Sequence, residues 1–261
     1  MSERYGLIGK NIQYSKSPKI HEFMAKRLGI PMKYDLFDVE EDELPRLVKL
    51  LRQGQIQGLN VTIPYKQTII KYVDVLTPKA QRIKAVNTLY LKNGQVVGDN
   101  TDYDGILGLI ARHKIDVKGK RVYILGTGGA AKATYVVLSD LGAQITVVSR
   151  QIVDQDPIFL HMITYSMINP KDVDLYINAT PIGTSPKVNE AVLTQTMVQH
   201  HTVIDLIYNP PVTELMKHAN VAYNGLLMLI IQAIKAEEIW FERKIDITDR
   251  LIDDLKEVIY T

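Results

Sequence analysis

The stretch VYILGTGGAAKATYVVLSDLGAQITVVSR, residues 122–150, decides the fold class. An apolar run leads into a glycine-rich turn, a longer segment with helical spacing and a second apolar run. This order predicts a strand, a helix and a parallel strand, which together form the βαβ unit of nucleotide-binding domains. Strand and helix patterns also alternate along the rest of the chain. We therefore expect an α/β protein with largely parallel sheets.

The turn within this stretch follows the spacing G-x-G-x-x-A over residues 126–131. Gly126 permits the tight turn, Gly128 lets the backbone approach a pyrophosphate, and the small Ala131 allows the helix to pack closely on the strand. The pyrophosphate would lie at the helix N-terminus, where backbone N–H groups are free to bind anions. Because apolar elements flank the turn on both sides, a dinucleotide site is favoured over a merely tight strand–helix turn.

The end of the second strand bears on the choice of dinucleotide. An NAD site would carry Asp or Glu near this point to accept from the ribose 2′-hydroxyl. Here the strand ends in Ser149 and Arg150, and the next acid is Asp154. A serine and an arginine suit a 2′-phosphate, so NADP is predicted rather than NAD. The alternative is that Arg150 is an ordinary solvated loop residue.

Composition excludes several classes of protein. The chain has 261 residues, enough for one large domain or two smaller ones. It is 46% hydrophobic and 23% charged with a net charge of +2, which argues against a nucleic-acid-binding protein. It has no cysteine, and therefore no disulfide, thiolate metal site or cysteine nucleophile. The six histidines lack metal-binding spacing, so no metal is predicted.

Two segments bear on location. The start, MSERYGLIGK, carries charge early and lacks the apolar core of a signal peptide. The most apolar run, residues 225–233, is too short to cross a bilayer. We expect a cytoplasmic protein that binds neither membranes nor nucleic acid.

A change of character after residue 102 predicts two domains. Residues 1–102 form an α/β domain, residues 103–225 form the Rossmann-like dinucleotide-binding domain, and the helices of 226–261 are expected to pack back on the first domain. Such a layout places ligands between the domains. In the first domain, the pattern predicts strands at 4–8, 33–38, 58–61, 85–91 and 95–98, with a hairpin turn at Asn93-Gly94 between the last two. Helices are expected to begin with Ser17 as N-cap and Pro18 at the first helical position, at residue 42, at Pro64 and at about Asp102.

The segment GLNVTIPYK, residues 58–66, ends in a lysine in an unusual position. If Pro64 opens a helix, Lys66 lies in its first turn, where a cation opposes the helix dipole at a cost of about 0.3–1 kcal/mol. The same field would lower the pKa of the amine and suit it to proton transfer near neutral pH. On local grounds, a tolerated surface lysine explains the position equally well.

Other polar residues pose similar questions. Asp102 starts a helix, where an acid is ordinary, although a carboxylate beside Lys66 would orient the amine. Asn87 interrupts an apolar strand and Gln232 an apolar helix, so each needs a hydrogen-bonding partner in the backbone or in a ligand. Tyr208 follows a strand and could offer its hydroxyl to a ligand.

Taken in order, eight short motifs resemble the shikimate dehydrogenase family over nearly the whole chain. They are SKSP (15–18), NVTIPYK (60–66), AVNT (85–88), GDNTDYDG (98–105), GTGGAAKA (126–133), NATPIGT (178–184), DLIYNPPVTEL (205–215) and NGLLMLIIQA (224–233). The resemblance implies the reversible NADPH-dependent reduction of 3-dehydroshikimate to shikimate, in the chorismate pathway to aromatic amino acids.

The resemblance also implies a role for each matching residue. Lys66 is the catalytic lysine and Asp102 its partner. The substrate-binding positions are Ser15 and Ser17 for the carboxylate, Thr62, Asn87, Asp102 and Gln232 for the ring hydroxyls, and Tyr208. The cofactor-binding positions are Gly126, Thr127, Gly128, Gly129 and Ala130 for the pyrophosphate, Ser149 and Arg150 for the adenosine phosphate, and Leu206 and Gly225 for the nicotinamide, with Met228 nearby.

Some positions depart from the family pattern. The first motif is preceded by Asn11 and Tyr14, and the phosphate clamp reads Ser149-Arg150-Gln151 with Asp154 where a base is usual, which weakens the case for NADP. The stretch from Arg150 to Leu175 is also short. The alternatives are a quinate or aminated-analogue dehydrogenase, with NADP or NAD, a folate-linked dehydrogenase, and a non-catalytic NADP-binding sensor. The chain could act as a monomer or a homodimer.

Overall fold

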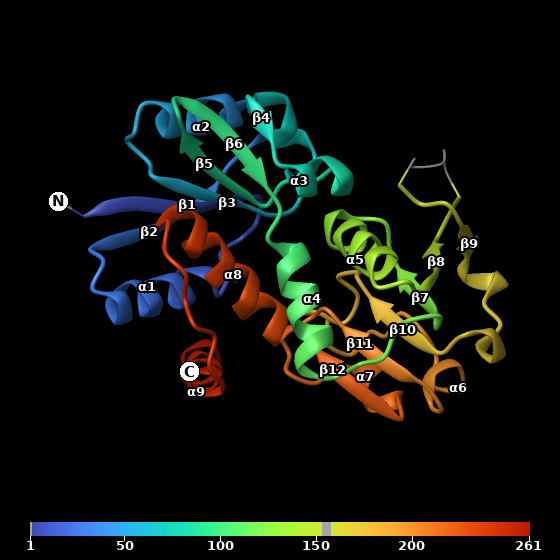
Figure 1. Cartoon of the computed structure of the whole chain (residues 1–261). Coiled ribbons are helices and arrows are strands. Elements are labelled where there is room, and N and C mark those ends of the chain that lie inside the picture. Colours follow the sequence, from blue (N-terminus) through green and yellow to red (C-terminus); the bar gives the residue numbers. More distant parts are fainter. Residues whose placement is uncertain (1, 153–157) are drawn as a thin grey trace. The chain divides into compact units, whose positions relative to one another are not determined.

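The computed structural model describes residues 2–152 and 158–261. The chain divides into two compact units (Figure 1). Unit 1 consists of Met1–Gly105 and Ile230–Thr261, and unit 2 consists of Ile106–Leu229. Each unit contains one six-stranded sheet.

Unit 1 has a mixed sheet with the strand order β2-β1-β3-β5-β6-β4. Its elements up to the end of the sheet are β1 (Glu3–Gly9), α1 (Ser17–Leu28), β2 (Met32–Asp38), α2 (Leu44–Arg52), β3 (Gly58–Val61), β4 (Val75–Leu76), α3 (Pro78–Ile83), β5 (Thr88–Lys92) and β6 (Gln95–Asp99). Short 3-10 helices span Glu41–Glu43 and Thr68–Tyr72. The β5–β6 hairpin turns at Asn93 and Gly94, both with positive φ, as predicted.

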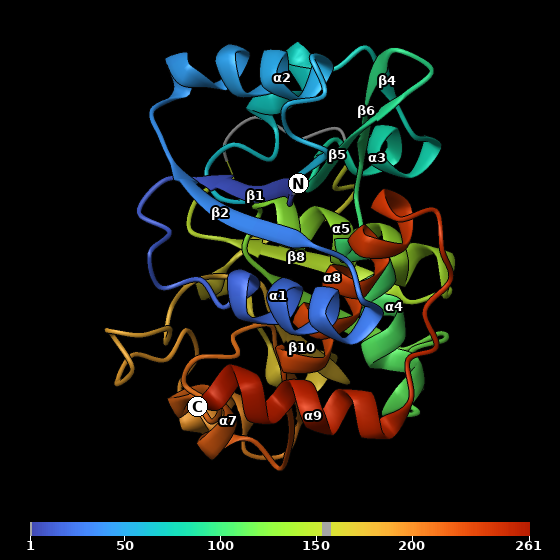
Figure 2. The ribbon, with the colours of Figure 1, turned by 90° about the vertical axis from the view of Figure 1, so that its left-hand side faces the viewer.

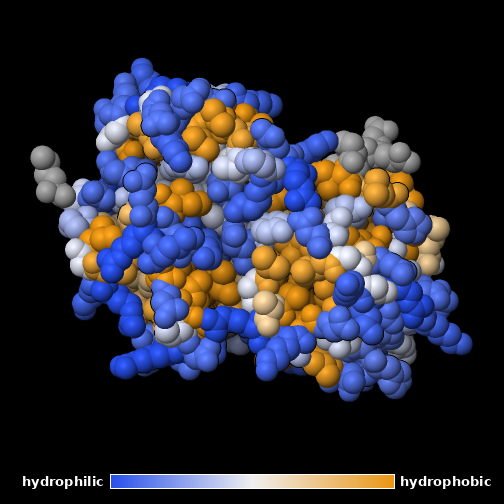
Figure 3. Space-filling view, viewed as in Figure 1, coloured by the Kyte–Doolittle hydropathy of each residue, from blue (hydrophilic) through white to orange (hydrophobic). Residues whose placement is uncertain are grey.

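Helices cover both faces of this sheet. Figures 1 and 2 show α2 on one face and α1 on the other. The chain returns to unit 1 within α8 (Leu226–Trp240) and ends in α9 (Asp249–Tyr260), which packs on α1. Gly58 lies so close to Trp240 that an added Cβ would collide with the indole ring. Hydrophilic residues cover much of the face shown in Figure 3, with apolar residues exposed between them.

Unit 2 has a fully parallel sheet with the order β12-β11-β10-β7-β8-β9. Its elements are the greater part of α4 (Asp102–Arg112), then β7 (Arg121–Leu125), α5 (Gly129–Asp140), β8 (Gln144–Ser149), β9 (Met162–Thr164), β10 (Leu175–Asn178), α6 (Gln195–Val198), β11 (Thr202–Asp205), α7 (Glu214–His218) and β12 (Val221–Asn224). The chain order reverses between β7 and β10, as in Rossmann-like domains. The predicted α/β class and βαβ unit are confirmed.

Three local predictions need correction or comment. No α-helix begins at Pro64: residues 63–67 form a turn and a 3-10 helix starts at Thr68. Ser17 is the first helical residue of α1 and not its N-cap, which is Lys16. Asp154 lies outside the described residues.

The described part of the chain lacks two features: a helix fit to span a membrane and a cluster of metal ligands. None of its helices combines the length and the apolar character that a membrane span needs. Within the same residues, no group of three or more His, Asp or Glu side chains is arranged to hold a metal ion.

Candidate active site

The predicted substrate residues of unit 1 gather because of strand direction. β1 and β3 are parallel, so the chain leaves both strands at the same edge of the sheet. β5 runs antiparallel to β3, with Asn60 opposite Thr88, and β6 antiparallel to β5, with Thr88 opposite Asp99. The start of β5 and the end of β6 therefore lie at that same edge. This topology brings together segments that are far apart in the sequence.

Lys66 is positioned by a well-anchored turn after β3. The side chain of its neighbour Tyr65 is buried, and the Tyr65 hydroxyl donates to the carbonyl of Val39 at 2.7 Å. The carbonyl of Lys66 itself accepts from the N–H of Val86 at 2.7 Å. Because there is no helix at Pro64, the predicted effect of a helix dipole on the amine does not apply. Backbone contacts to the segment before Asn87 hold Lys66 instead.

The Lys66 Nζ atom lies 2.6 Å from Oδ2 of Asp102. The lysine side chain is 16% exposed and the aspartate side chain 5%, so the pair is largely shielded while the amine still reaches solvent. An ion pair in such a site is stronger than one on the surface. The contact leaves the ammonium with further protons that a ligand oxygen could receive.

Asn87 and Gln232 complete this polar group. The Asn87 amide nitrogen donates to Oδ1 of Asp102 at 2.9 Å and lies 3.4 Å from Oε1 of Gln232. Asn87 directly precedes β5, which begins three residues later than predicted, and is 2% exposed. The predicted need for hydrogen-bonding partners is met by these side chains. Lys66, Asp102, Asn87 and Gln232 thus form one connected group.

The serines and the threonine also follow strands at this edge. Ser15 lies on the loop between β1 and α1 and Ser17 is the first residue of α1, with their hydroxyl oxygens 3.2 Å apart. The Ser15 hydroxyl also accepts from the N–H of Ser17 at 3.2 Å. Thr62 directly follows β3, where its N–H donates to the carbonyl of Ile8 at 2.8 Å. All three are placed where strands β1 and β3 end.

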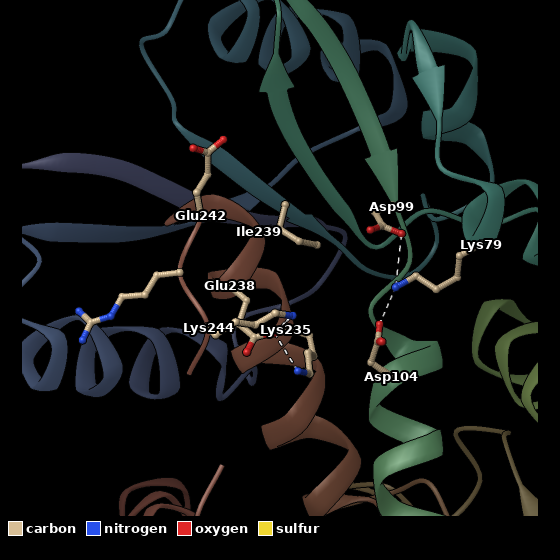
Figure 4. A pocket seen from close by; sticks show the side chains of 9 residues that line it. Lys79, Asp99, Asp104, Lys235, Glu238, Ile239, Glu242 and Lys244 are labelled. Atoms are coloured by element: carbon tan, nitrogen blue, oxygen red, sulfur yellow. Dashed lines mark hydrogen bonds and ion pairs between the residues drawn. The ribbon is translucent and has the colours of Figure 1, made fainter. Parts of the chain in front are cut away.

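The segment that carries Asp102 is held from a second side by Lys79 of α3. Its Nζ atom lies 2.6 Å from Oδ2 of Asp104 and 3.6 Å from Oδ1 of Asp99, so one ammonium bridges both ends of the turn (Figure 4). These groups line a charged pocket of about 290 Å³ that also includes Lys235 and Glu238 of α8. Within it, Lys235 lies 2.8 Å from Glu238.

In unit 2 the glycine-rich turn lies between β7 and α5, beside the point where the strand order reverses. Gly126 has φ +105°, a conformation that only glycine adopts without strain. At Gly128 an added Cβ would meet nothing within 4 Å, so the protein leaves space beside this backbone. Thr127 lies between them, and Gly129 and Ala130 open the first turn of α5. The free N–H groups of that turn are suited to a phosphate.

Ser149 and Arg150 lie where β8 ends, as predicted. Arg150 is exposed. Burial raises the pKa of Tyr165 above its usual value, and the positive charge of Arg150 opposes this rise. The exposed guanidinium at the carboxyl end of a strand is suited to a phosphate ester.

The remaining predicted positions follow β11 and β12. Leu206 and Tyr208 come after β11, and Gly225 comes between β12 and α8. A Cβ at Gly225 would collide with the carbonyl oxygen of Leu206, so only glycine permits this close approach of the two segments. Met228 is buried in the first turns of α8.

The loop that follows β11 is anchored by the buried Asp205. Its carboxylate accepts from the hydroxyl of Thr213 at 2.6 Å and from the amide of Asn178 at 3.0 Å. Burial raises the pKa of Asp205 to about 6, against the opposing effect of these bonds. The motifs that begin with Asn178 and Asp205 therefore meet at one buried carboxylate.

Sequence reasoning missed three buried residues next to the Lys66–Asp102 pair: Asn60, Thr88 and Thr101. Each makes hydrogen bonds within the group around Asn87. The signal was present for Asn60, which interrupts the apolar strand GLNV in the same way that Asn87 interrupts AVNTLYL.

Comparison with known proteins gives a consistent result. Residues 7–89 match the family model for the shikimate dehydrogenase substrate binding domain. A shikimate dehydrogenase (NADP(+)) from Clostridium beijerinckii is 40% identical over 254 residues, which cover 94% of each chain. The crystal structure of shikimate dehydrogenase 1 from Peptoclostridium difficile superposes with a TM-score of 0.91 at 37% identity, covering 98% of this chain and 99% of that one.

A third relative was solved with ligands bound. The Thermus thermophilus shikimate 5-dehydrogenase in complex with NADP(H) and shikimate is 26% identical, with a TM-score of 0.84, over 99% of this chain and 98% of that one.

Proposed function

This chain belongs to the shikimate dehydrogenase family, and from that premise we propose that it catalyses the reversible NADPH-dependent reduction of 3-dehydroshikimate to shikimate. The observation that carries the mechanism is the 2.6 Å contact between Lys66 Nζ and Asp102 Oδ2. It provides a shielded proton donor and a carboxylate that orients it, as reduction of a carbonyl requires.

We propose a division of labour between the two units. Unit 1, which includes the last helices, binds the substrate, and unit 2 binds NADP(H). The convergence of polar residues at one sheet edge of unit 1 supports the first assignment. The strand order and the glycine-rich turn support the second.

In the proposed reaction, Lys66 gives a proton to the C3 oxygen as the carbonyl is reduced and takes it back in the reverse direction. Asp102 holds the ammonium by one oxygen, which fixes the direction of the amine. NADPH, when bound, supplies the hydride to the carbonyl carbon. Because the lysine side chain is only 16% exposed, few solvent molecules compete for its proton.

The substrate carboxylate is assigned to Ser15 and Ser17, whose hydroxyls form a pair of adjacent donors. The ring hydroxyls are assigned to the connected polar side chains and their neighbour after β3: Thr62, Asn87, Asp102 and Gln232. Tyr208 is assigned as a further contact. Amides donate to and accept from hydroxyls, and an ionised carboxylate accepts from them. Such a site discriminates strongly against analogues that lack those hydroxyls.

The residues of unit 2 fit a dinucleotide phosphate. Gly126 provides the left-handed turn and Gly128 the open space beside the backbone. The pyrophosphate is assigned to Gly126, Thr127, Gly128, Gly129 and Ala130. We assign the 2′-phosphate to Ser149 and Arg150, and the nicotinamide end to Leu206 and Gly225, with Met228 nearby.

Replacing Gly128 by alanine is expected to weaken NADPH binding about tenfold or more without destabilising the fold. The new methyl group meets no protein atom within 4 Å, so it occupies only the space assigned to the pyrophosphate. NADPH fluorescence titration measures the binding, and urea unfolding measures the stability. Gly126→Ala is the contrasting variant, because φ +105° makes it lose about 1–3 kcal/mol of stability. Unchanged NADPH affinity in Gly128→Ala would contradict the assignment of the pyrophosphate to this turn.

The proposed function is tested by following nicotinamide reduction with shikimate or quinate as substrate and NADP+ or NAD+ as cofactor. We expect the highest kcat/KM with shikimate and NADP+. A higher value with quinate would reassign the substrate, and a higher value with NAD+ would remove the phosphate role from Arg150. Turnover with none of the four pairs would overturn the enzyme assignment.

A further inference from the structure

We propose that Thr88, Asn60 and Tyr34 are positioning residues for the reaction: their hydrogen bonds form a one-way relay that ends at Asp102 and fixes its carboxylate toward Lys66. The proposal rests on the proposed function, since it concerns the same site. It assigns a role to three buried polar side chains that touch neither substrate nor cofactor in that scheme.

The relay begins at the carboxylate and runs inward. Each oxygen of Asp102 receives one side-chain donor, Oδ2 from Lys66 at 2.6 Å and Oδ1 from Asn87 at 2.9 Å. Two donors on opposite oxygens determine the plane of the carboxylate. Any rotation of the Asn87 amide would therefore turn Asp102 and shift the ammonium that it holds.

The orientation of the Asn87 amide is set by its oxygen. This oxygen accepts from the backbone N–H of Thr101 at 2.7 Å and from the hydroxyl of Thr88 at 2.9 Å. A backbone N–H can only donate, so the amide oxygen must face it and the amide nitrogen must face Asp102. The hydroxyl of Thr101 lies 3.2 Å from the same oxygen, and Thr88 makes the shorter of the two hydroxyl bonds that keep the amide from rotating.

The direction of the Thr88 hydroxyl is set in turn by Asn60. The amide nitrogen of Asn60 lies 3.2 Å from the carbonyl of Asn87 and 3.4 Å from the Thr88 hydroxyl. A carbonyl can only accept, so it holds the nitrogen side of the Asn60 amide toward both groups. The Thr88 hydroxyl therefore accepts a hydrogen bond from Asn60 and donates one to the amide oxygen of Asn87.

Tyr34 closes the inner end of the relay. Its hydroxyl donates to the amide oxygen of Asn60 at 2.7 Å. The four side chains from Tyr34 to Asn87 are between 0% and 5% exposed, so water cannot replace a missing partner easily. From Tyr34 through Asn60, Thr88 and Asn87, each side chain donates a hydrogen bond to the next one toward Asp102, an arrangement in which successive bonds strengthen one another.

The first test removes the hydroxyl of Thr88. We expect Thr88→Val to lower kcat/KM for shikimate about fivefold, the fold-change of one ordinary hydrogen bond, and Thr88→Ser to restore it. The KM for NADPH, which reports on unit 2, should stay within about twofold. In an Asp102→Asn background, Thr88→Val should have no further effect on the rate, because its target carboxylate is gone.

The second test is a matched pair of tyrosines. Tyr34→Phe is expected to lower kcat/KM for shikimate about threefold, since it removes the most distant donor. Tyr176→Phe is the control, because the buried Tyr176 hydroxyl in unit 2 has no hydrogen-bond partner among the described residues. It should leave the rate unchanged.

The outcomes separate the relay from the function on which it rests. If the wild-type protein does not oxidise shikimate, the proposed function fails. If it does, the relay is overturned when Thr88→Val keeps the wild-type rate, or when its loss is as large in Asp102→Asn as in the wild type. The relay is supported if Thr88→Val lowers the rate in the wild type but not in Asp102→Asn, and if Thr88→Ser restores the rate.

Discussion

Replacing Lys66 by alanine is expected to lower kcat about 10²- to 10⁴-fold, the usual contribution of a positioned proton donor. Binding of shikimate should weaken much less, because the other polar side chains assigned to the substrate remain. Asp102 would be left 5% exposed without its ammonium partner, but Asn87 still donates to its other oxygen. Steady-state kinetics and equilibrium titration with shikimate separate the two effects.

Lys71→Ala is the matched control for this variant. Lys71 lies in the 3-10 helix that follows the Lys66 turn, its side chain is 69% exposed, and its ion pair with Glu41 is long at 4.0 Å. Removing it should leave kcat unchanged. Near-normal turnover in Lys66→Ala would show that Lys66 is not the proton donor.

The second large effect is expected for Asp102→Asn, which should lower kcat about 10²-fold. The side chain keeps its shape, but only one of its two polar atoms can still accept a hydrogen bond. Both Lys66 and Asn87 donate to the native carboxylate, so the amide must turn its own NH₂ toward one of these donors. The Lys66 ammonium is then no longer held in one orientation, and it loses the attraction of the negative charge beside it.

Asp249→Asn tests the alternative that Asp102 is only a favourable acid in the first turn of a helix. Asp249 occupies the first turn of α9, as Asp102 does in α4. If the helix dipole alone mattered, both variants would lose about 0.3–1 kcal/mol of stability and neither would lose activity. An unchanged rate in Asp102→Asn would therefore show that Asp102 serves only to stabilise the start of the helix.

Sequence patterns predicted the elements that local chemistry specifies. The run of residues 122–150 gave the βαβ unit because apolar strands and a glycine-rich turn admit few other structures. Asn93-Gly94 predicted the hairpin because both residues tolerate positive φ. Short elements such as β4 and β9 carry too few residues to show a period, and they form because neighbouring strands offer an edge.

The error at Pro64 shows where local patterns fail. Proline at the first position of a helix is a sound signal, but here a tertiary contact decides the structure. The Tyr65 side chain is buried and its hydroxyl binds the carbonyl of Val39, which holds the chain in a turn until Thr68. Lys66 nevertheless lies 2.6 Å from Asp102, because the strand order brings their two segments together.

The candidate site was visible in the sequence only in part. The pairing of Lys66 with Asp102 came from the family resemblance. The two residues lie on separate segments, and nothing in their distance along the chain required a contact. Asn60 and Thr88 escaped notice because their roles depend on register: they lie opposite one another only after β3 and β5 pair. Periodicity shows that a strand is buried, whereas the partner strand and its register come from tertiary structure.

The most direct test of the central claim is the single-turnover rate of NADPH formation, measured by stopped flow with saturating shikimate and with enzyme in excess over NADP+. This rate reports the chemical step and excludes product release. The Lys66–Asp102 account predicts that Lys66→Ala loses about 10²-fold or more in this rate while a parallel titration shows that shikimate still binds. A variant that binds shikimate and transfers hydride at the wild-type rate would contradict it.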